Sequence, residues 1–184
     1  MKFYLVAGAN GSGKTTLAKE ILGNMPDLYF LNSDEIAAEL GDDLGIKSGK
    51  ILLARFEKCL LEGRSIVLES TISGHHHFRI LEKVRHAGYE IYFIYVFLDF
   101  MELNVSRVKN RVLLGGHDVP KNDISRRYYR SLQNFEKTKI VADKWELFHN
   151  VDNTFEKIAF GNEENNILNK ESYNIFKELI KCGH

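Results

Sequence analysis

Cysteine, proline and an excess of charge of either sign are scarce or absent in this chain of 184 residues. It has only two prolines and two cysteines, Cys59 and Cys182, which are far apart in sequence and form no metal-spaced pair. Its 25 Lys and Arg residues balance 25 Asp and Glu residues, so no net charge attracts the protein to nucleic acid or to an anionic membrane. A hydrophobic content of 44% excludes a disordered chain. We therefore expect a reduced, cytoplasmic protein.

Long hydrophobic runs are also absent. The longest, Ile91–Leu98, has eight residues, whereas a membrane-spanning helix needs about 20. The first apolar stretch, Phe3–Ala7, is too short for the core of a signal peptide and leads straight into glycines. These lengths predict a soluble protein of one domain, with neither a membrane nor a nucleic acid as its partner.

Short apolar runs alternate with longer amphipathic stretches, which is typical of βαβ units around a parallel sheet. Strands are predicted at Phe3–Ala7, Leu28–Leu31, Ser65–Leu68, Glu90–Leu98 and Glu146–His149. Helices are predicted at Lys14–Leu22, from Glu35 onward, and at Lys47–Leu61, His77–His86, Met101–Leu114 and Lys121–Lys139. This pattern predicts an α/β three-layer sandwich with a central parallel sheet over residues 1–161, followed by a C-terminal helical appendage at 162–184.

A glycine-rich P-loop motif follows the first predicted strand. Residues 8–15 match G-x-x-x-x-G-K-[ST] in full, with an apolar strand before them and a helix-forming segment after them. Glycines let backbone N–H groups curl around phosphate oxygens at the positive end of the helix dipole. Lys14 is expected to reach the β- and γ-phosphates of ATP, and Thr15 to offer its hydroxyl to Mg²⁺. The predicted ATP-binding residues are Gly8, Ala9, Asn10, Gly11, Ser12, Gly13, Lys14, Thr15 and Thr16.

Carboxylates stand at the ends of three predicted strands, where the functional side chains of an open parallel sheet collect. Asp34 and Glu69 lie beside the P-loop in this arrangement, and either can orient an acceptor hydroxyl and take its proton. The alternatives are structural: Ser33 or Asp34 caps the next helix, and Glu69 is a buried carboxylate paired with an arginine. Asp99 is either a Walker B aspartate or the N-cap of the helix that follows it.

Hydroxyl groups are concentrated just after the third predicted strand, in the segment Glu69-Ser70-Thr71-Ile72-Ser73-Gly74. Such a segment suits a polar acceptor such as a sugar, because every unmatched hydroxyl would cost binding energy. Three histidines, His75, His76 and His77, come next, and consecutive side chains cannot share one helix face. We interpret this run as a solvated loop and not as a metal site.

Positive charge is concentrated at residues 105–130, where seven basic side chains face two acidic ones for a net charge of +5. Two predicted helices flank the loop Leu114–Pro120, whose glycines can act as hinges. This arrangement is typical of a helical lid that closes over ATP, with arginines neutralising charge on the transferred phosphoryl group. The alternatives are a solvated helix face and a nucleic-acid contact, which the lack of net charge disfavours.

These motifs together resemble the zeta toxin family of P-loop kinases, specifically its short stand-alone members, over residues 1–161. Besides the P-loop, the resemblance rests on Asn32-Ser33-Asp34-Glu35-Ile36-Ala37, on Glu69–Gly74, and on Gly115-Gly116-His117-Asp118-Val119-Pro120 followed by Arg126-Arg127-Tyr128. The resemblance implies an ATP-dependent kinase that phosphorylates the 3′-hydroxyl of UDP-N-acetylglucosamine and is restrained by an antitoxin. Asn32 departs from the family, because it stands where the toxins often have an acidic residue.

The resemblance also implies roles for individual residues. The residues it places in catalysis are Lys14, Asp34, Arg111, Arg126 and Arg127. Of these, Arg111 and either Arg126 or Arg127 would contact the γ-phosphate. The residues it places at the acceptor are Asp34, Glu69 and Thr71, and Thr15 is the residue it places at Mg²⁺. A function of another class stays open at this point: an ATP-binding interaction or switch protein, in which the basic segment grips a partner and no small molecule is phosphorylated.

Overall fold

A single sheet of seven strands organises the part of the chain that the computed structural model describes, residues 1–41, 46–116, 118–162 and 164–182. The strands are β1 (Lys2–Ala7), β2 (Tyr29–Leu31), β3 (Ile66–Ser70), β4 (Glu90–Phe97), β5 (Lys144–Val151), β6 (Thr154–Gly161) and β7 (Asn165–Ile167). The helices are α1 (Lys14–Asn24), α2 (Ser33–Leu40), α3 (Ile46–Leu61), α4 (His76–His86), α5 (Met101–Leu113), α6 (Lys121–Ile140) and α7 (Lys170–Cys182). The predicted α/β class is confirmed.

The sheet is parallel at its centre and antiparallel at one edge. Its order is β2-β3-β1-β4-β5-β6-β7, and the first five of these strands pair in parallel. The antiparallel strands β6 and β7 were not predicted. A two-residue turn joins β5 to β6, and both of its residues, Asp152 and Asn153, have positive φ, as a tight hairpin requires. The predicted last strand, Glu146–His149, therefore belongs to a longer strand that turns back on itself.

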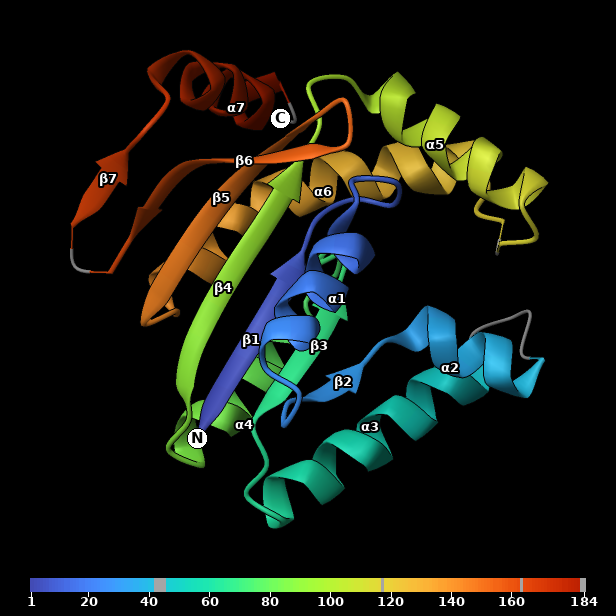
Figure 1. The fold of residues 1–184 in the computed structure, drawn as a ribbon, viewed down its shortest axis with the longest axis vertical. Coiled ribbons are helices and arrows are strands. Elements are labelled where there is room, and N and C mark those ends of the chain that lie inside the picture. Colours follow the sequence, from blue (N-terminus) through green and yellow to red (C-terminus); the bar gives the residue numbers. More distant parts are fainter. Residues whose placement is uncertain (42–45, 117, 163, 183–184) are drawn as a thin grey trace.

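Helices cover the two faces of the sheet unequally (Figure 1). On one face α1 packs Leu17 and Ala18 against Tyr4 and Val6 of β1. The other face carries the larger core, in which side chains from α3, α4, α6 and α7 meet the opposite side chains of β1 and β4. Since β1 and β4 are buried on both faces, their continuous apolar runs fit central parallel strands.

The C-terminal helix α7 packs against the larger core. Its Phe176 is 1% exposed and its ring contacts the rings of Phe135, Tyr95 and Phe97. This helix therefore forms part of the larger core. Among the described residues, no helix is both long enough and apolar enough to cross a membrane.

Candidate active site

The P-loop adopts a backbone that only glycine tolerates at several of its positions. Gly11 has φ +81° and Gly13 has φ +95°, both in the region that side chains disfavour. A Cβ on Gly11 would lie 2.5 Å from the carbonyl oxygen of Asn104, and one on Gly13 would lie 2.4 Å from Asn150 Nδ2. The glycines of the motif are therefore required both for the turn and for the close approach of neighbouring elements.

Two buried asparagines brace this loop from outside it. Asn104 of α5 donates from Nδ2 to the carbonyl oxygen of Asn10 at 2.7 Å, and Asn150 of β5 donates to that of Ser12 at 2.8 Å. Arg107 in turn donates to Asn150 Oδ1 at 3.4 Å. Sequence reasoning missed both asparagines; the one available signal was that Asn150 lies near the carboxyl end of a predicted strand. The loop is thus held in shape by side chains about 90 and 140 residues away in the chain.

Glu69, at the end of β3, forms the centre of a buried polar cluster. Its Oε1 accepts a hydrogen bond from Thr15 Oγ1 at 2.9 Å and lies 3.4 Å from Lys14 Nζ. Its Oε2 accepts from Asn32 Nδ2 at 2.7 Å. Glu69 is only 7% exposed, and it is paired with the P-loop lysine and not with an arginine. The structure thus brings together four residues from three separate sequence motifs.

Asp34 is not a helix cap. The N-cap of α2 is Asn32, whose Oδ1 accepts from the backbone N–H groups of Asp34 and Glu35 at 2.7 and 3.2 Å. The expectation that Ser33 or Asp34 caps this helix is therefore wrong, since the asparagine one position earlier does so. The carboxylate of Asp34 is half-exposed, and its Oδ2 lies 4.0 Å from an Arg111 nitrogen. Its side chain is available to a ligand.

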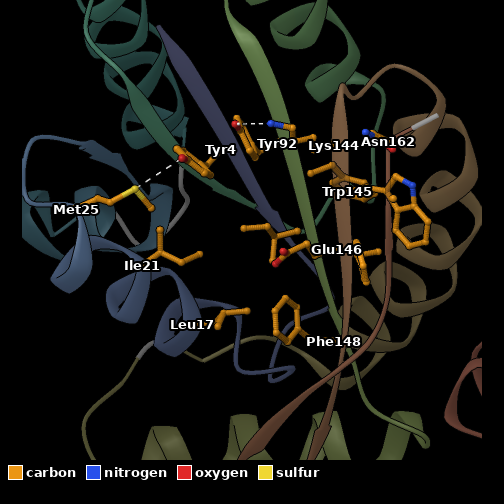
Figure 2. Close-up of a pocket in the computed structure, with 14 residues that line it drawn as sticks. Tyr4, Leu17, Ile21, Met25, Tyr92, Lys144, Trp145, Glu146, Phe148 and Asn162 are labelled. Atoms are coloured by element: carbon orange, nitrogen blue, oxygen red, sulfur yellow. Dashed lines mark hydrogen bonds between the residues drawn. The ribbon is translucent and has the colours of Figure 1, made fainter. Parts of the chain in front are cut away.

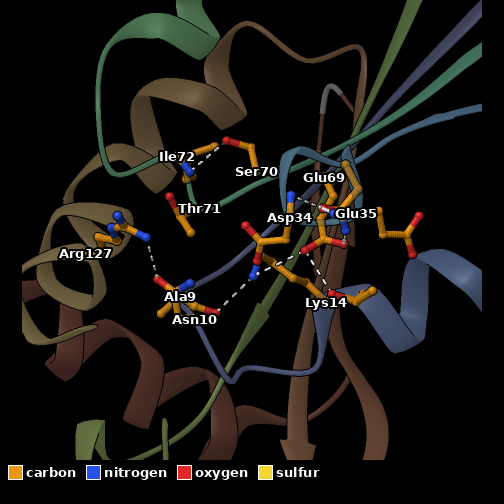
Figure 3. Close-up of polar contacts among 12 residues, drawn as sticks. Ala9, Asn10, Lys14, Asp34, Glu35, Glu69, Ser70, Thr71, Ile72 and Arg127 are labelled. Atoms are coloured by element: carbon orange, nitrogen blue, oxygen red, sulfur yellow. Dashed lines mark hydrogen bonds and ion pairs between the residues drawn. The ribbon is translucent and has the colours of Figure 1, made fainter. Parts of the chain in front are cut away.

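A cavity of about 560 Å³ opens onto these groups. Lys14, Asp34 and Glu69 line it from three different elements, and Thr71 lines it from the loop after β3 (Figure 3). Other lining residues come from α3, from the start of α4 and from Arg127 of α6. Thr15 stands beside it through its bond to Glu69, whereas Thr16 is exposed on α1. The cavity has the size of a small-molecule site.

The histidine run does not behave as one solvated loop. His75 and His76 are exposed, but His77 is 4% exposed, and its Nε2 lies 3.0 Å from Thr138 Oγ1 of α6. Burial lowers the pKa of His77 to about 4, so the ring is neutral at physiological pH. The prediction of a solvated run is wrong at His77, because α4 begins at His76 and turns the next side chain inward.

The basic segment contributes arginines to the site unequally. Arg127 donates to Asn10 Oδ1 at 3.4 Å and lines the cavity. Arg126 pairs instead with Asp123 at 2.7 Å on the exposed side of α6. Arg111 comes from the last turn of α5, opposite Asp34. The helices α5 and α6 share a small core of their own; the loop between them includes His117, which lies outside the described residues.

Asp99 has neither of the two roles considered for it. The N-cap position of α5 is Phe100, and Asp99 Oδ1 lies 2.6 Å from His149 Nε2. His149 is buried, stacks on Phe97 and reaches Ser172 of α7 at 3.2 Å. Asp99 therefore joins β4 to β5 and, through His149, to α7. Of the three strand-end carboxylates, Glu69 is the one that contacts Thr15.

Oxygen atoms suited to Mg²⁺ lie beside the P-loop. Thr15 Oγ1 and Glu69 Oε1 are 2.9 Å apart, and both belong to the ligand types that Mg²⁺ prefers. Within the described residues, no group of three or more His, Cys, Asp or Glu side chains forms a metal site. Mg²⁺ usually binds one or two protein oxygens together with substrate phosphates, and Thr15 Oγ1 and Glu69 Oε1 are the candidate protein oxygens here.

A second hollow, of about 470 Å³, lies beside α1 on the less covered face of the sheet (Figure 2). Its walls are mainly apolar and include Leu17, Ile21 and Met25 of α1. Both tyrosine hydroxyls in its walls already have hydrogen-bond partners within the protein. The Tyr92 hydroxyl accepts from Lys144 at 3.2 Å, and the Tyr4 hydroxyl donates to the Met25 sulfur at 3.6 Å. It contains none of the P-loop or strand-end residues, so the chemistry of phosphate belongs to the first cavity.

Comparison with known proteins places this site in a family. The AAA domain family matches residues 4–127, which include the P-loop, Asp34, Glu69 and the start of α6. The chain belongs to the AAA domain family. An uncharacterized protein of Haemophilus influenzae is 26% identical over 131 residues, which make up 69% of this chain and 92% of that protein.

Solved structures of other proteins share the fold of this chain. A chain from the AvrRxo1-ORF1:AvrRxo1-ORF2 complex with sulphate ions superposes with a TM-score of 0.75 at 17% identity, over 97% of this chain. This chain spans 63% of the length of that one. A chain from the PezAT toxin–antitoxin system of Streptococcus pneumoniae gives a TM-score of 0.68 at 16% identity, over 99% of this chain and 84% of the other.

Proposed function

We propose that this protein of the AAA domain family transfers the γ-phosphoryl group of ATP to a hydroxyl group of a small acceptor. The observation that carries the proposal is that Lys14 of the P-loop and Asp34 line one cavity. The carboxylate of Asp34 does not cap α2, because Asn32 does so. That cavity is also lined by the hydroxyl-rich loop after β3, which provides a place for the acceptor. A protein that only binds and hydrolyses a nucleotide as a switch has no need of room for an acceptor beside the phosphate site.

Each residue of the site has a distinct task in this reaction. Lys14 leaves Glu69 and binds the β- and γ-phosphates, which are the ligands of a P-loop lysine. Thr15 and Glu69 would hold Mg²⁺, which neutralises charge on those phosphates when it is bound. Arg127, and Arg111 opposite Asp34, balance the charge of the γ-phosphoryl group. Asp34 orients the acceptor hydroxyl and takes its proton as the new O–P bond forms and ADP departs.

The acceptor we propose is a nucleotide sugar, and UDP-N-acetylglucosamine is the first to test. Thr71 and Ser73 place two hydroxyls 3.0 Å apart on the cavity wall, which suits a polyhydroxylated molecule. An inhibitory partner protein is part of the proposal, since the fold neighbours come from an AvrRxo1-ORF1:AvrRxo1-ORF2 complex and a toxin–antitoxin system. ATP is the proposed phosphoryl donor, and one crystal of the AvrRxo1 complex contains it.

The decisive experiment separates ATP binding from phosphoryl transfer. Asp34→Asn keeps the size of the side chain and does not affect the α2 cap, so the variant should bind ATP as the wild type does. Its turnover with UDP-N-acetylglucosamine should fall by about 10²–10⁴-fold, the usual worth of general-base catalysis. Mass spectrometry would detect the product as a gain of one phosphate. Asp27→Asn, an exposed change in the turn before β2, is the matched control and should leave turnover unchanged.

Other outcomes have defined meanings. ATP hydrolysis that yields no phosphorylated product from a panel of nucleotide sugars would favour the interaction or switch function. Near-normal transfer by Asp34→Asn would move the role of the base to another group, with Glu69 the next candidate. Lys14→Ala with unchanged ATP affinity would refute the assignment of the nucleotide site itself.

A further inference from the structure

Ile72 has a strained backbone in the loop after β3. Its φ is +45°, although it is β-branched and 1% exposed. Branched residues avoid this left-handed region because Cβ is crowded against the backbone, and such strain persists only where the surroundings enforce it. The loop that carries Ile72, residues 71–75, joins β3 to α4; we call it the acceptor loop.

Side chains hold both polar backbone groups of Ile72. Its N–H donates to Ser70 Oγ at 3.0 Å, and its carbonyl oxygen accepts from Asn134 Nδ2 at 2.7 Å. Asn134 belongs to α6 and is 7% exposed, so this second hydrogen bond is buried. A buried amide aimed at the carbonyl of a strained residue is a specific constraint on the conformation of the loop.

The far end of the acceptor loop is tied to the same helix. Thr138, one turn after Asn134, donates from Oγ1 to the Asn134 carbonyl oxygen at 2.7 Å and lies 3.0 Å from His77 Nε2. His77 stands in the first turn of α4, directly after the loop. One face of α6 thus holds the loop near its beginning through Ile72 and just after its end through His77.

The conformation enforced in this way determines what the cavity presents to a ligand. Thr71, Ser73 and Gly74 of the acceptor loop line the cavity that Lys14 and Asp34 also line. Rotation of the Ile72 backbone into an ordinary conformation would redirect the neighbouring Thr71 and Ser73 away from their present positions. ATP-binding groups would be spared, because the P-loop is braced by Asn104 and Asn150 from other elements.

We propose that Asn134 is a positioning residue for the acceptor: its hydrogen bond to Ile72 keeps the acceptor loop in the shape that binds the acceptor. This inference rests on the proposed phosphotransferase function. It makes α6 the helix that determines the shape of the acceptor side of the site. The same helix carries Arg127, seven residues earlier, against the P-loop. Asn134 does not line the cavity and reaches it only through Ile72, so its removal should act on acceptor binding and not on ATP binding.

Steady-state kinetics with ATP and UDP-N-acetylglucosamine test this role. Asn134→Ala should raise the KM for UDP-N-acetylglucosamine about tenfold, which corresponds to about 1.4 kcal/mol and to the scale of one buried hydrogen bond. The KM for ATP should change less than about twofold by the same reasoning. Ser131→Ala is the matched control, because it removes a buried hydrogen bond to Tyr95 from the same helix without touching the acceptor loop. It should leave both KM values unchanged.

A second variant tests the strain directly. Glycine adopts positive φ without cost, so in an Ile72→Gly background the loop no longer depends on Asn134. The additional effect of Asn134→Ala on the acceptor KM should shrink from about tenfold to below about threefold there. An undiminished tenfold effect would mean that Asn134 acts by another route. Asn134→Ser replaces Asn134→Ala in both backgrounds if the alanine protein does not fold.

Hydrogen exchange of the loop amides gives an outcome that is independent of the acceptor. In Asn134→Ala the amides of residues 71–75 should exchange about tenfold faster than in wild type, and in Ser131→Ala they should not. Unchanged exchange, or equal acceleration in the control, would overturn the proposal. If wild-type protein phosphorylates none of the sugars while Asn134→Ala alone loosens the loop, the proposed function fails and the structural role of Asn134 stands.

Discussion

The neutral, buried His77 should make the free energy of unfolding depend on pH. Burial lowers the pKa of His77 to about 4, whereas the same side chain in the unfolded chain titrates near 6.5. The proton affinity of His77 is therefore about 300-fold lower in the folded protein than in the unfolded chain, which corresponds to about 3 kcal/mol. Between these two pH values the unfolded chain binds a proton that the folded protein excludes. His77 therefore reduces stability as the pH falls from 6.5 to 4, and its contribution is constant above about 7 and below about 4.

Urea unfolding at half-unit steps from pH 5 to pH 8 measures this effect. The wild-type free energy of unfolding should fall by up to about 1.4 kcal/mol per pH unit below pH 6.5 on account of His77. His77→Gln can still hydrogen-bond to Thr138 but does not titrate, so its curve should be flatter by that amount. The exposed neighbour provides the control: His76→Gln should run parallel to wild type.

Parallel curves for wild type and His77→Gln between pH 5 and pH 6.5 would refute the reasoning, as would a His77 pKa above 6 in an NMR titration. The lower end of the range is kept at pH 5 because carboxylates begin to titrate below it.

Four further changes test other parts of the structure. Glu69→Gln should raise the Mg²⁺ concentration for half-maximal turnover about 10–100-fold, because the carboxylate beside Thr15 is lost; an unchanged Mg²⁺ requirement would remove Glu69 from the metal site. Asn150→Ala should raise the KM for ATP about tenfold by leaving a buried P-loop carbonyl unpaired, and an unaltered KM would show that the brace is dispensable. Gly13→Ala should abolish ATP binding measured by calorimetry, whereas Gly23→Ala, which has no neighbour within 4 Å, should not. Phe176→Ala should lower the free energy of unfolding in urea by about 3–5 kcal/mol, and a loss below about 1 kcal/mol would mean that α7 contributes little to the core.

The predicted strands and helices around the P-loop match the structure closely because both carry strong local signals. Buried parallel strands need continuous apolar runs, and helices on their faces need apolar spacing at three and four residues. The antiparallel strands at the edge of the sheet, β6 and β7, have no such continuous apolar pattern. Strand β6 is buried at only three of its eight positions, and the turn before it depends on positive φ at Asp152 and Asn153, which the sequence did not signal clearly.

Local sequence by itself determined the phosphate-binding loop, because its chemistry depends on the backbone freedom of a few adjacent glycines and on Lys14 and Thr15. Only the tertiary structure decided which groups surround each of the three strand-end carboxylates. Glu69, Asp34 and Asp99 occupy equivalent positions in the pattern, yet one meets the P-loop lysine, one faces the cavity and one pairs with His149. Their partners come from elements that the order of strands in the sheet brings side by side. The surroundings of each carboxylate depend on those neighbouring elements, which are far from it in the sequence, so no local stretch of sequence could reveal them.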